Sequence, residues 1–190
     1  SQIASGVVPF HRPRAESNYF EKAESSAGWI KELENEHTPE TEEYGIGSFV
    51  YRRNIPFHPK KFLDFVQQKF PLNVIRSKGL FWIASRNDQA LNFSSAGGSI
   101  KADAAGVWWV SMPFSERIKY ASFIDNQEEI ESGWEKDFGD RKIELVFIGQ
   151  NLNVDAITHE LDLCLLNENE LVDLKSGNLS LEDRWPIPNL

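Results

Sequence analysis

The residues that could bind a metal ion are few and are spread along the chain. His58 stands at the start of a predicted helix, and His37 lies among glutamates that could supply oxygen ligands to a divalent cation. His159 shares one helical face with Asp155 and Asp162. Each has an ordinary alternative: helix capping for His58, a solvated acidic linker for His37 and an exposed polar face for His159. We keep His58 and His37 as candidate metal ligands beside those alternatives.

Residues 76–82 combine basic and aromatic side chains within one predicted strand. Arg76, Lys78 and Trp82 could bind single-stranded nucleic acid by charge and stacking, or dock against another protein. The ordinary alternative is a structural strand whose charges are incidental. Because the net charge of -9 opposes binding to a phosphate backbone, we rank nucleic acid below protein docking.

The motifs of several large enzyme classes are absent from the sequence. It contains no G-x-x-x-x-G-K-[ST] loop for a nucleoside triphosphate, no G-x-S-x-G nucleophile elbow and no H-E-x-x-H zinc site. The single cysteine, Cys164, excludes an internal disulfide and a thiolate metal cluster, and it falls on the apolar stripe of a predicted helix. We therefore do not expect this chain to be an enzyme by itself.

The elements that would position these side chains follow the order β-α-β-β-β-α-β-α. Apolar periodicity and turn residues predict strands over residues 46–53, 74–85, 90–95, 106–112 and 142–148. Helices are expected after Pro59, in the acidic stretch beyond Pro113 and after Asn153, while Gly79 is expected to break its strand. This order predicts the α+β class, a mainly antiparallel sheet with helices packed on one face, and a ferredoxin-like variant is the topology it favours.

Charge is distributed in blocks. Residues 16–43 contain nine acids against two bases, and residues 52–86 contain eight bases against a single acid. Such blocks are usually solvated faces, and the alternative is that one of them docks against an oppositely charged partner. No run approaches the roughly 18 apolar residues that span a bilayer, and no secretory signal pattern opens the sequence. We expect a cytoplasmic protein with no membrane partner.

Several short segments carry, in order, a likeness to a known family. They are HTPETEEYGI (37–46), SFVYR (48–52), PFHP (56–59), RSKG (76–79), FWIA (81–84), GVWW (106–109), GDR (139–141), ELVFIG (144–149) and LDLCLL (161–166). As an ordered set they closely resemble the C-terminal domain of the CobW family of metallochaperone GTPases. The resemblance covers roughly residues 20–170.

What the resemblance implies is a two-domain parent protein. An N-terminal P-loop GTPase with a Cys-x-Cys-Cys motif delivers zinc, cobalt or another transition metal to a client, and members are linked to cobalamin synthesis, nitrile hydratase activation and zinc homeostasis. GTP and Mg²⁺ would bind only in that missing domain, whereas zinc or cobalt could bind to the domain in this chain. Composition predicts a flexible leader over residues 1–17, an acidic linker within 18–43 and an irregular tail over 171–190. The resemblance implies that 18–43 also contains the end of the GTPase domain and that 44–170 is the CobW C-terminal domain.

The resemblance and the basic block together predict an interaction and regulatory domain. Its partners would be the GTPase domain of the same parent chain and a client metalloprotein. The expected contact residues are His58, Arg76, Lys78, Trp82 and Arg141. Two alternatives stay open: autonomous, weak transition-metal binding through His58 or His37, and single-stranded RNA binding.

Overall fold

The computed structural model describes residues 45–187, in which five strands form one antiparallel sheet. The strands are β1 (Ile46–Arg53), β2 (Val74–Phe81), β3 (Gln89–Ala96), β4 (Ser99–Val107) and β5 (Ile143–Gln150). They lie in the order β1-β5-β2-β3-β4, and each neighbouring pair is antiparallel. The predicted α+β class with a mainly antiparallel sheet is confirmed. The predicted leader, the predicted linker and His37 lie outside the described residues.

The connection from β1 to β2 is a split β-α-β unit. Both strands are antiparallel to β5, which lies between them, so they are parallel to each other. The crossover contains α2 (Pro59–Asp64), which continues as a π-helical turn over Phe65–Lys69. This unit is shared with ferredoxin-like folds. In this chain the last strand, β5, lies between β1 and β2, whereas β3 and β4 follow one another on the other side of β2.

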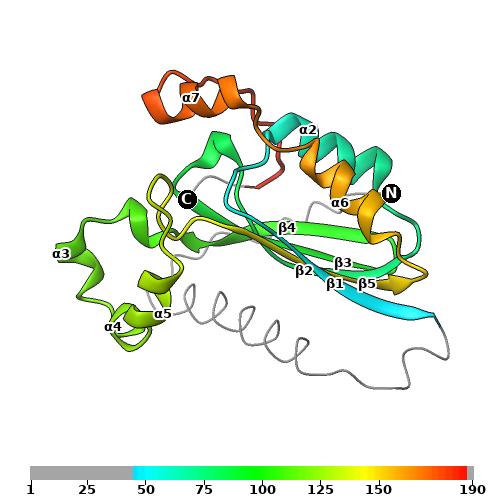
Figure 1. The fold of residues 1–190 in the computed structure, drawn as a ribbon, viewed down its shortest axis with the longest axis horizontal. Helices are drawn as coiled ribbons and strands as arrows, with labels where there is room; N and C mark the ends of the chain where they lie inside the picture. The colour runs from blue at the N-terminus through cyan, green and yellow to red at the C-terminus, as the bar shows by residue number, and fades with distance from the viewer. Residues whose placement is uncertain (1–44, 188–190) are drawn as a thin grey trace, which may run out of the picture.

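The helices fall into two groups (Figure 1). On one side of the sheet lie α2, α6 (Val154–Asp162) and α7 (Glu168–Ser176). The connection from β4 to β5 forms a lobe beyond one end of the strands, with α3 (Phe114–Arg117), α4 (Ala121–Asp125) and α5 (Gln127–Ser132). None of the helices between residues 45 and 187 has the length and apolar character that crossing a bilayer requires.

The core between the sheet and its helices is built largely from aromatic rings. Phe62 of α2 stacks on Phe57 with 4.0 Å between ring centroids and packs against Phe81 at 5.3 Å. Trp185 completes the stack at 5.4 Å from Phe62. Burying each such side chain contributes about 1.5–3 kcal/mol, so this cluster holds α2 on the sheet.

Gly79 does not break its strand, contrary to the prediction. Its backbone has φ +153°, and β2 runs through it without interruption. A Cβ at this position would collide with the carbonyl oxygen of Glu144 on β5. The glycine therefore permits a close approach between two central strands.

Two further predictions are wrong. Residues 106–112 are not one strand, because β4 ends at Val107 and a 3₁₀ turn follows over Trp109–Ser111. The irregular tail predicted over residues 171–190 starts too early, because residues 171–176 belong to α7, whereas residues 177–187 form no helix or strand. A capping box starts α7: the Asn167 side chain accepts from the Glu170 amide, and the Glu170 carboxylate accepts from the Asn167 amide. Farther on, Trp185 returns to the core, 6% exposed.

Candidate interaction surface

Basic and apolar residues share the face of the sheet that points away from α2 and α6. Residues directly opposite in neighbouring strands lie on the same face. The register therefore forms three rows across β1, β5 and β2: Val50–Val146–Lys78, Arg52–Glu144–Leu80 and Ser48–Ile148–Arg76. We call this surface the second face. Its centre is apolar, and its cations come from both flanking strands.

The one acid in these rows is already neutralised by cations. Arg52 donates to Glu144 Oε1 at 2.9 Å, and the Lys142 ammonium lies 3.0 Å from Oε2. Burial raises the pKa of Glu144, but Lys142 and Arg52 outweigh it and hold that pKa below its usual value. Glu144 therefore stays ionised near neutral pH, and Arg76 and Lys78 leave the second face with a positive balance.

Of the predicted contact residues, Arg76 and Lys78 lie together on the second face. Arg76 is exposed and Lys78 is half-buried. Both have interactions within the protein, so a partner would have to compete for these side chains. Their two-residue spacing on β2 puts both side chains on one face, which is the signal that the sequence offered.

His58 lies elsewhere, at the N-terminus of α2. Its Nδ1 accepts from the amides of Lys60 at 3.2 Å and Lys61 at 3.5 Å, so His58 caps the helix. Its Nε2 is 3.9 Å from the Glu170 carboxylate. Burial lowers the pKa of His58, with a smaller opposing effect from Glu170. The capping alternative therefore describes its contacts.

Trp82 and Arg141 are both buried. Trp82 has no exposed surface, and its ring meets Phe138 edge-on at 5.2 Å. The Arg141 guanidinium lies 5.6 Å from the Trp82 ring centroid and donates to the carbonyl oxygen of Asn87 at 2.6 Å. Burial leaves Trp82 no surface to offer a partner, and Arg141 ties the start of β5 to the turn before β3.

Asp140, next to Arg141, orders the turn that follows β4. Its two carboxylate oxygens accept from the amides of Trp109 and Val110, each at 2.8 Å. Burial raises the pKa of Asp140, and those two amides act in the opposite direction. The predicted family segment at residues 139–141 is thus a structural junction.

The described residues contain no group of three or more His, Cys, Asp and Glu side chains that could hold a metal ion. His159 is exposed, and its neighbour Asp162 instead accepts hydrogen bonds from Tyr51 at 2.8 Å and Arg53 at 2.7 Å. Cys164 is buried, and burial raises its pKa to about 11. A thiol so protonated is a poor metal ligand.

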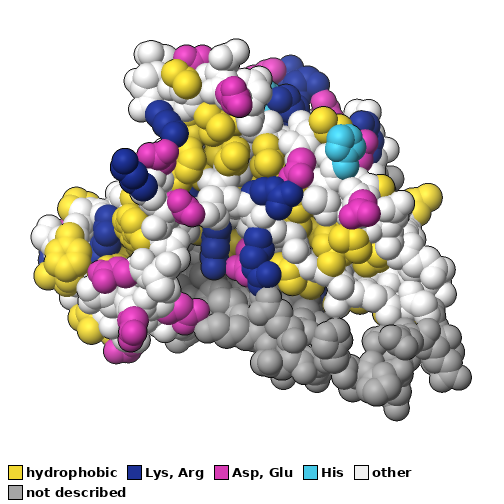
Figure 2. All heavy atoms as spheres, in the orientation of Figure 1, with side chains coloured by type: hydrophobic (Ala, Val, Ile, Leu, Met, Phe, Trp, Pro, Cys, Tyr) yellow, Lys and Arg dark blue, Asp and Glu magenta, His cyan; other side chains and the backbone are white. Residues whose placement is uncertain are grey.

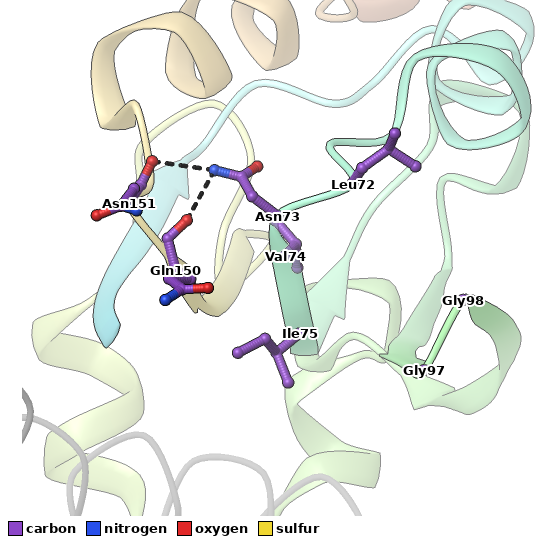
Figure 3. Close-up of a pocket in the computed structure, with 8 residues that line it drawn as sticks. All are labelled: Leu72, Asn73, Val74, Ile75, Gly97, Gly98, Gln150 and Asn151. Carbon is purple, nitrogen blue, oxygen red and sulfur yellow. Dashed lines mark hydrogen bonds between the residues drawn. The ribbon is translucent and has the colours of Figure 1, made fainter. Parts of the chain in front are cut away.

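A shallow pocket of about 550 Å³ lies where β2 begins and β5 ends (Figure 3). The Asn73 side chain reaches across it and donates to the carbonyl oxygens of Gln150 and Asn151, both at 3.0 Å. Leu72 and Ile75 are exposed beside it. Its lining contains no titratable side chain, so it offers apolar contact and backbone polarity rather than catalysis.

The α3–α5 lobe presents a different surface. Phe114, Ile118 and Ile124 are 45–56% exposed, and apolar and acidic side chains stand side by side over this part of the molecule (Figure 2). The acids there would favour a basic partner, whereas the second face would favour an acidic one.

Comparisons with known proteins assign the chain to a class. A sequence profile described as the cobalamin synthesis protein cobW C-terminal domain matches residues 46–165, which is more than half of the chain. The chain belongs to this family, as the ordered segments predicted.

Two relatives carry names that concern zinc. The zinc-regulated GTPase metalloprotein activator 1 of Dictyostelium discoideum is 39% identical over 156 residues, which are 80% of this chain and 32% of that protein. A zinc chaperone of Mycobacterium tuberculosis is 30% identical over 131 residues, or 68% of this chain and 31% of that protein. The chain thus spans about a third of the length of these relatives.

A solved structure, the Zn(II)-bound YjiA GTPase from E. coli, superposes with a TM-score of 0.45. The match is 18% identical and covers 70% of this chain and 33% of that one. From the family and the relatives, the chain is a domain associated with metallochaperones and GTPases.

Proposed function

We propose that this chain is the interaction and regulatory domain of a CobW-like, GTP-dependent metal chaperone, and that the second face is its binding surface. The observation that carries the proposal is the alignment of Arg52, Arg76 and Lys78 beside the apolar Val146 and Ile148. The half-buried Val50, Leu80 and Ile148 can supply affinity when a partner completes their burial, and the cations steer an acidic partner and fix its register.

The partners that fit this role are the GTP-binding part of the parent protein and a client metalloprotein. The unmatched two-thirds of the relatives' length leave room for a nucleotide-binding domain. We infer that GTP and Mg²⁺ bind there, since the sequence of this chain has no P-loop. The relatives' names favour zinc as the metal delivered, and the family description keeps cobalt, for cobalamin synthesis, as the alternative. We place this activity in the cytoplasm.

A binding titration tests the proposal. The part of the Dictyostelium relative that this chain does not match is purified and titrated with the chain by calorimetry, with GTP and Mg²⁺ present. Arg76→Glu with Lys78→Glu should weaken binding at least tenfold, because two attractive contacts become repulsive. The effect should shrink at high salt.

A matched variant separates a local effect from a loss of net charge. Lys60→Glu with Lys69→Glu makes the same change in charge on the helix side of the sheet, where both lysines are exposed. This control should bind within about twofold of the unmodified chain. Equal weakening by both variants, or by neither, would show that the second face is not the binding surface, provided that circular dichroism shows both to be folded.

A further inference from the structure

The α3–α5 lobe carries a group of exposed apolar side chains. Among residues 45–187, eight large apolar side chains are exposed, and three of them, Phe114, Ile118 and Ile124, lie within residues 114–124. Phe114 begins α3 and Ile118 caps its end four positions later, so the two lie on one side of that helix. Isolated exposed apolar residues are ordinary on a protein surface, whereas a group of them marks a binding surface.

These side chains are exposed on a lobe that is itself packed. Phe123 of α4 is 1% exposed, and its ring centroid lies 5.1 Å from that of Trp109 and 6.3 Å from that of Phe114. The Arg117 guanidinium lies 4.7 Å from the centroid of the Trp134 ring and joins α3 to the segment after α5. The lobe therefore presents its apolar side chains from an ordered framework, which lowers the cost of binding a partner.

The charge beside this apolar group is negative. Residues 121–135 contain five acids and no lysine, arginine or histidine. Lys119, just before this stretch, already pairs with Glu116 at 2.7 Å. Figure 2 shows acidic side chains next to apolar ones over the lobe. The five acids are all exposed and are Asp125, Glu128, Glu129, Glu131 and Glu135.

The sign of this charge decides which partner fits the lobe. The acids repel phosphate, so the lobe suits neither nucleic acid nor an anionic lipid surface. The described part of the chain also has no group of three potential ligands for a metal ion. A protein segment that carries lysine or arginine beside apolar side chains matches both the charge and the apolar contact area of the lobe.

We propose that the α3–α5 lobe is a separate docking surface, and that it binds a basic segment of another protein in which apolar side chains accompany the lysines or arginines. The inference goes beyond the proposed function, which concerns the second face. The lobe lies beyond one end of the strands (Figure 1), and its charge is opposite to that of the second face. Each surface therefore repels the partner that the other attracts, and the domain distinguishes a basic partner from an acidic one.

Fluorescence anisotropy with designed peptides tests the proposal. The probe is a labelled peptide with leucine at helical spacing and lysine at the other positions, titrated with the full 190-residue chain. We expect one peptide to bind per chain. A peptide with glutamate in place of lysine, and another with serine in place of leucine, should each bind at least about tenfold more weakly.

Two kinds of variant locate the peptide on the lobe. Ile118→Ser with Ile124→Ser removes apolar contact, and Asp125→Lys with Glu128→Lys reverses the charge. Each pair should weaken binding of the leucine–lysine peptide at least about tenfold. All four side chains are exposed, so circular dichroism should show both variants to be folded.

Matched controls lie on the helix side of the sheet. Leu163→Ser with Val172→Ser removes two apolar side chains of similar exposure, and Glu168→Lys with Asp173→Lys makes the same change in charge on α7. Both controls should bind the peptide within about twofold of the unmodified chain, because they are distant from the lobe.

Four results would overturn the proposal. Three are absence of binding, equal binding of the glutamate peptide, and equal weakening by the lobe variants and their controls. The fourth is self-association of the unmodified chain in sedimentation equilibrium that Ile118→Ser with Ile124→Ser abolishes, which would make a second copy the occupant of the lobe. No GTP-binding part is present in these experiments, so failure here leaves the calorimetric test of the proposed function intact.

Discussion

Replacing Trp185 by alanine should destabilise the whole domain, although this residue lies in the stretch for which the sequence predicts an irregular tail. Trp185 is 6% exposed and stacks on Phe62 and Phe81, at 5.4 and 5.2 Å. Its indole N–H donates to the carbonyl oxygen of Pro59 at 2.9 Å. These contacts join the C-terminal stretch, α2 and β2 in one cluster.

The magnitude follows from burial and the hydrogen bond of Trp185. A buried tryptophan removes about 150–250 Å² from water, and at about 25 cal/mol per Å² that corresponds to roughly 4–6 kcal/mol. Alanine keeps part of this burial and the cavity partly relaxes, which gives the usual cost of about 3–5 kcal/mol. Loss of the indole donor adds about 1 kcal/mol. We expect a decrease of about 4 kcal/mol in the free energy of unfolding, a large share of a typical total of about 5–15 kcal/mol.

Urea unfolding followed by circular dichroism measures this free energy for the unmodified chain and for Trp185→Ala. Trp134→Ala is the control, because Trp134 is half-buried and meets Arg117 by a cation–π contact at 4.7 Å in the lobe. It should cost about 1 kcal/mol. A Trp185→Ala effect below about 1 kcal/mol, or one no larger than that of the control, would refute the assignment of the C-terminal stretch to the core.

Three further variants test single contacts. Gly79→Ala should cost about 3 kcal/mol or more in urea unfolding, since its Cβ collides with the backbone of β5, whereas Gly47→Ala, with open space around it, should cost less than about 1 kcal/mol. His58→Ala should lose about 1 kcal/mol of helix capping at neutral pH. Burial lowers the pKa of His58 in the folded state, so the unmodified chain should lose stability as pH falls below about 6.5. His58→Ala should lack this loss of stability. The same pH dependence in both proteins would contradict the effect of burial. Arg86→Ala should cost about 3 kcal/mol at neutral pH, because Arg86 pairs with Asp183 at 2.6 Å and its removal leaves that carboxylate without its cation. Burial raises the pKa of Asp183, but the contact with Arg86 outweighs it, so the unmodified chain should lose this stabilisation as pH falls below about 4, and the difference from the variant should shrink there.

Local patterns in the sequence were sufficient for most elements of the fold. The apolar and β-branched run at residues 142–148 predicted β5, and Asn153 predicted the start of α6, where its side chain accepts from the Ala156 amide. These signals lie within a few residues of one another, so chain neighbours alone reveal them.

Long-range packing was not predictable in the same way. Gly79 looked like a strand breaker because its role depends on the Glu144 carbonyl of another strand. The aromatic residues after Val107 looked like a continued strand, but Asp140, 31 positions after Trp109 and 30 after Val110, accepts from both of their amides and stabilises a turn. The capping box at Asn167 was a local signal that could have been found.

The sequence was sufficient to group some of the candidate contact residues on one surface, but not others. Arg76 and Lys78 share a face by strand alternation, whereas His58, Trp82 and Arg141 were chosen by residue type and have structural roles in the cap and core. The apolar centre was missed, although one signal existed. Apolar residues at nearly every position of β5 indicate a strand covered on both faces.

Site-specific photo-crosslinking tests whether the second face binds the GTP-binding part of such a chaperone. The photoreactive amino acid p-benzoylphenylalanine is placed at Ile148 in one variant and at Ile124 of the α3–α5 lobe in another, and each is irradiated with the unmatched part of the Dictyostelium relative. We predict a crosslinked product from position 148, weakened by Arg76→Glu with Lys78→Glu, and little from position 124. Crosslinking from position 124 alone would place the partner on the acidic lobe and exclude the second face as its binding surface.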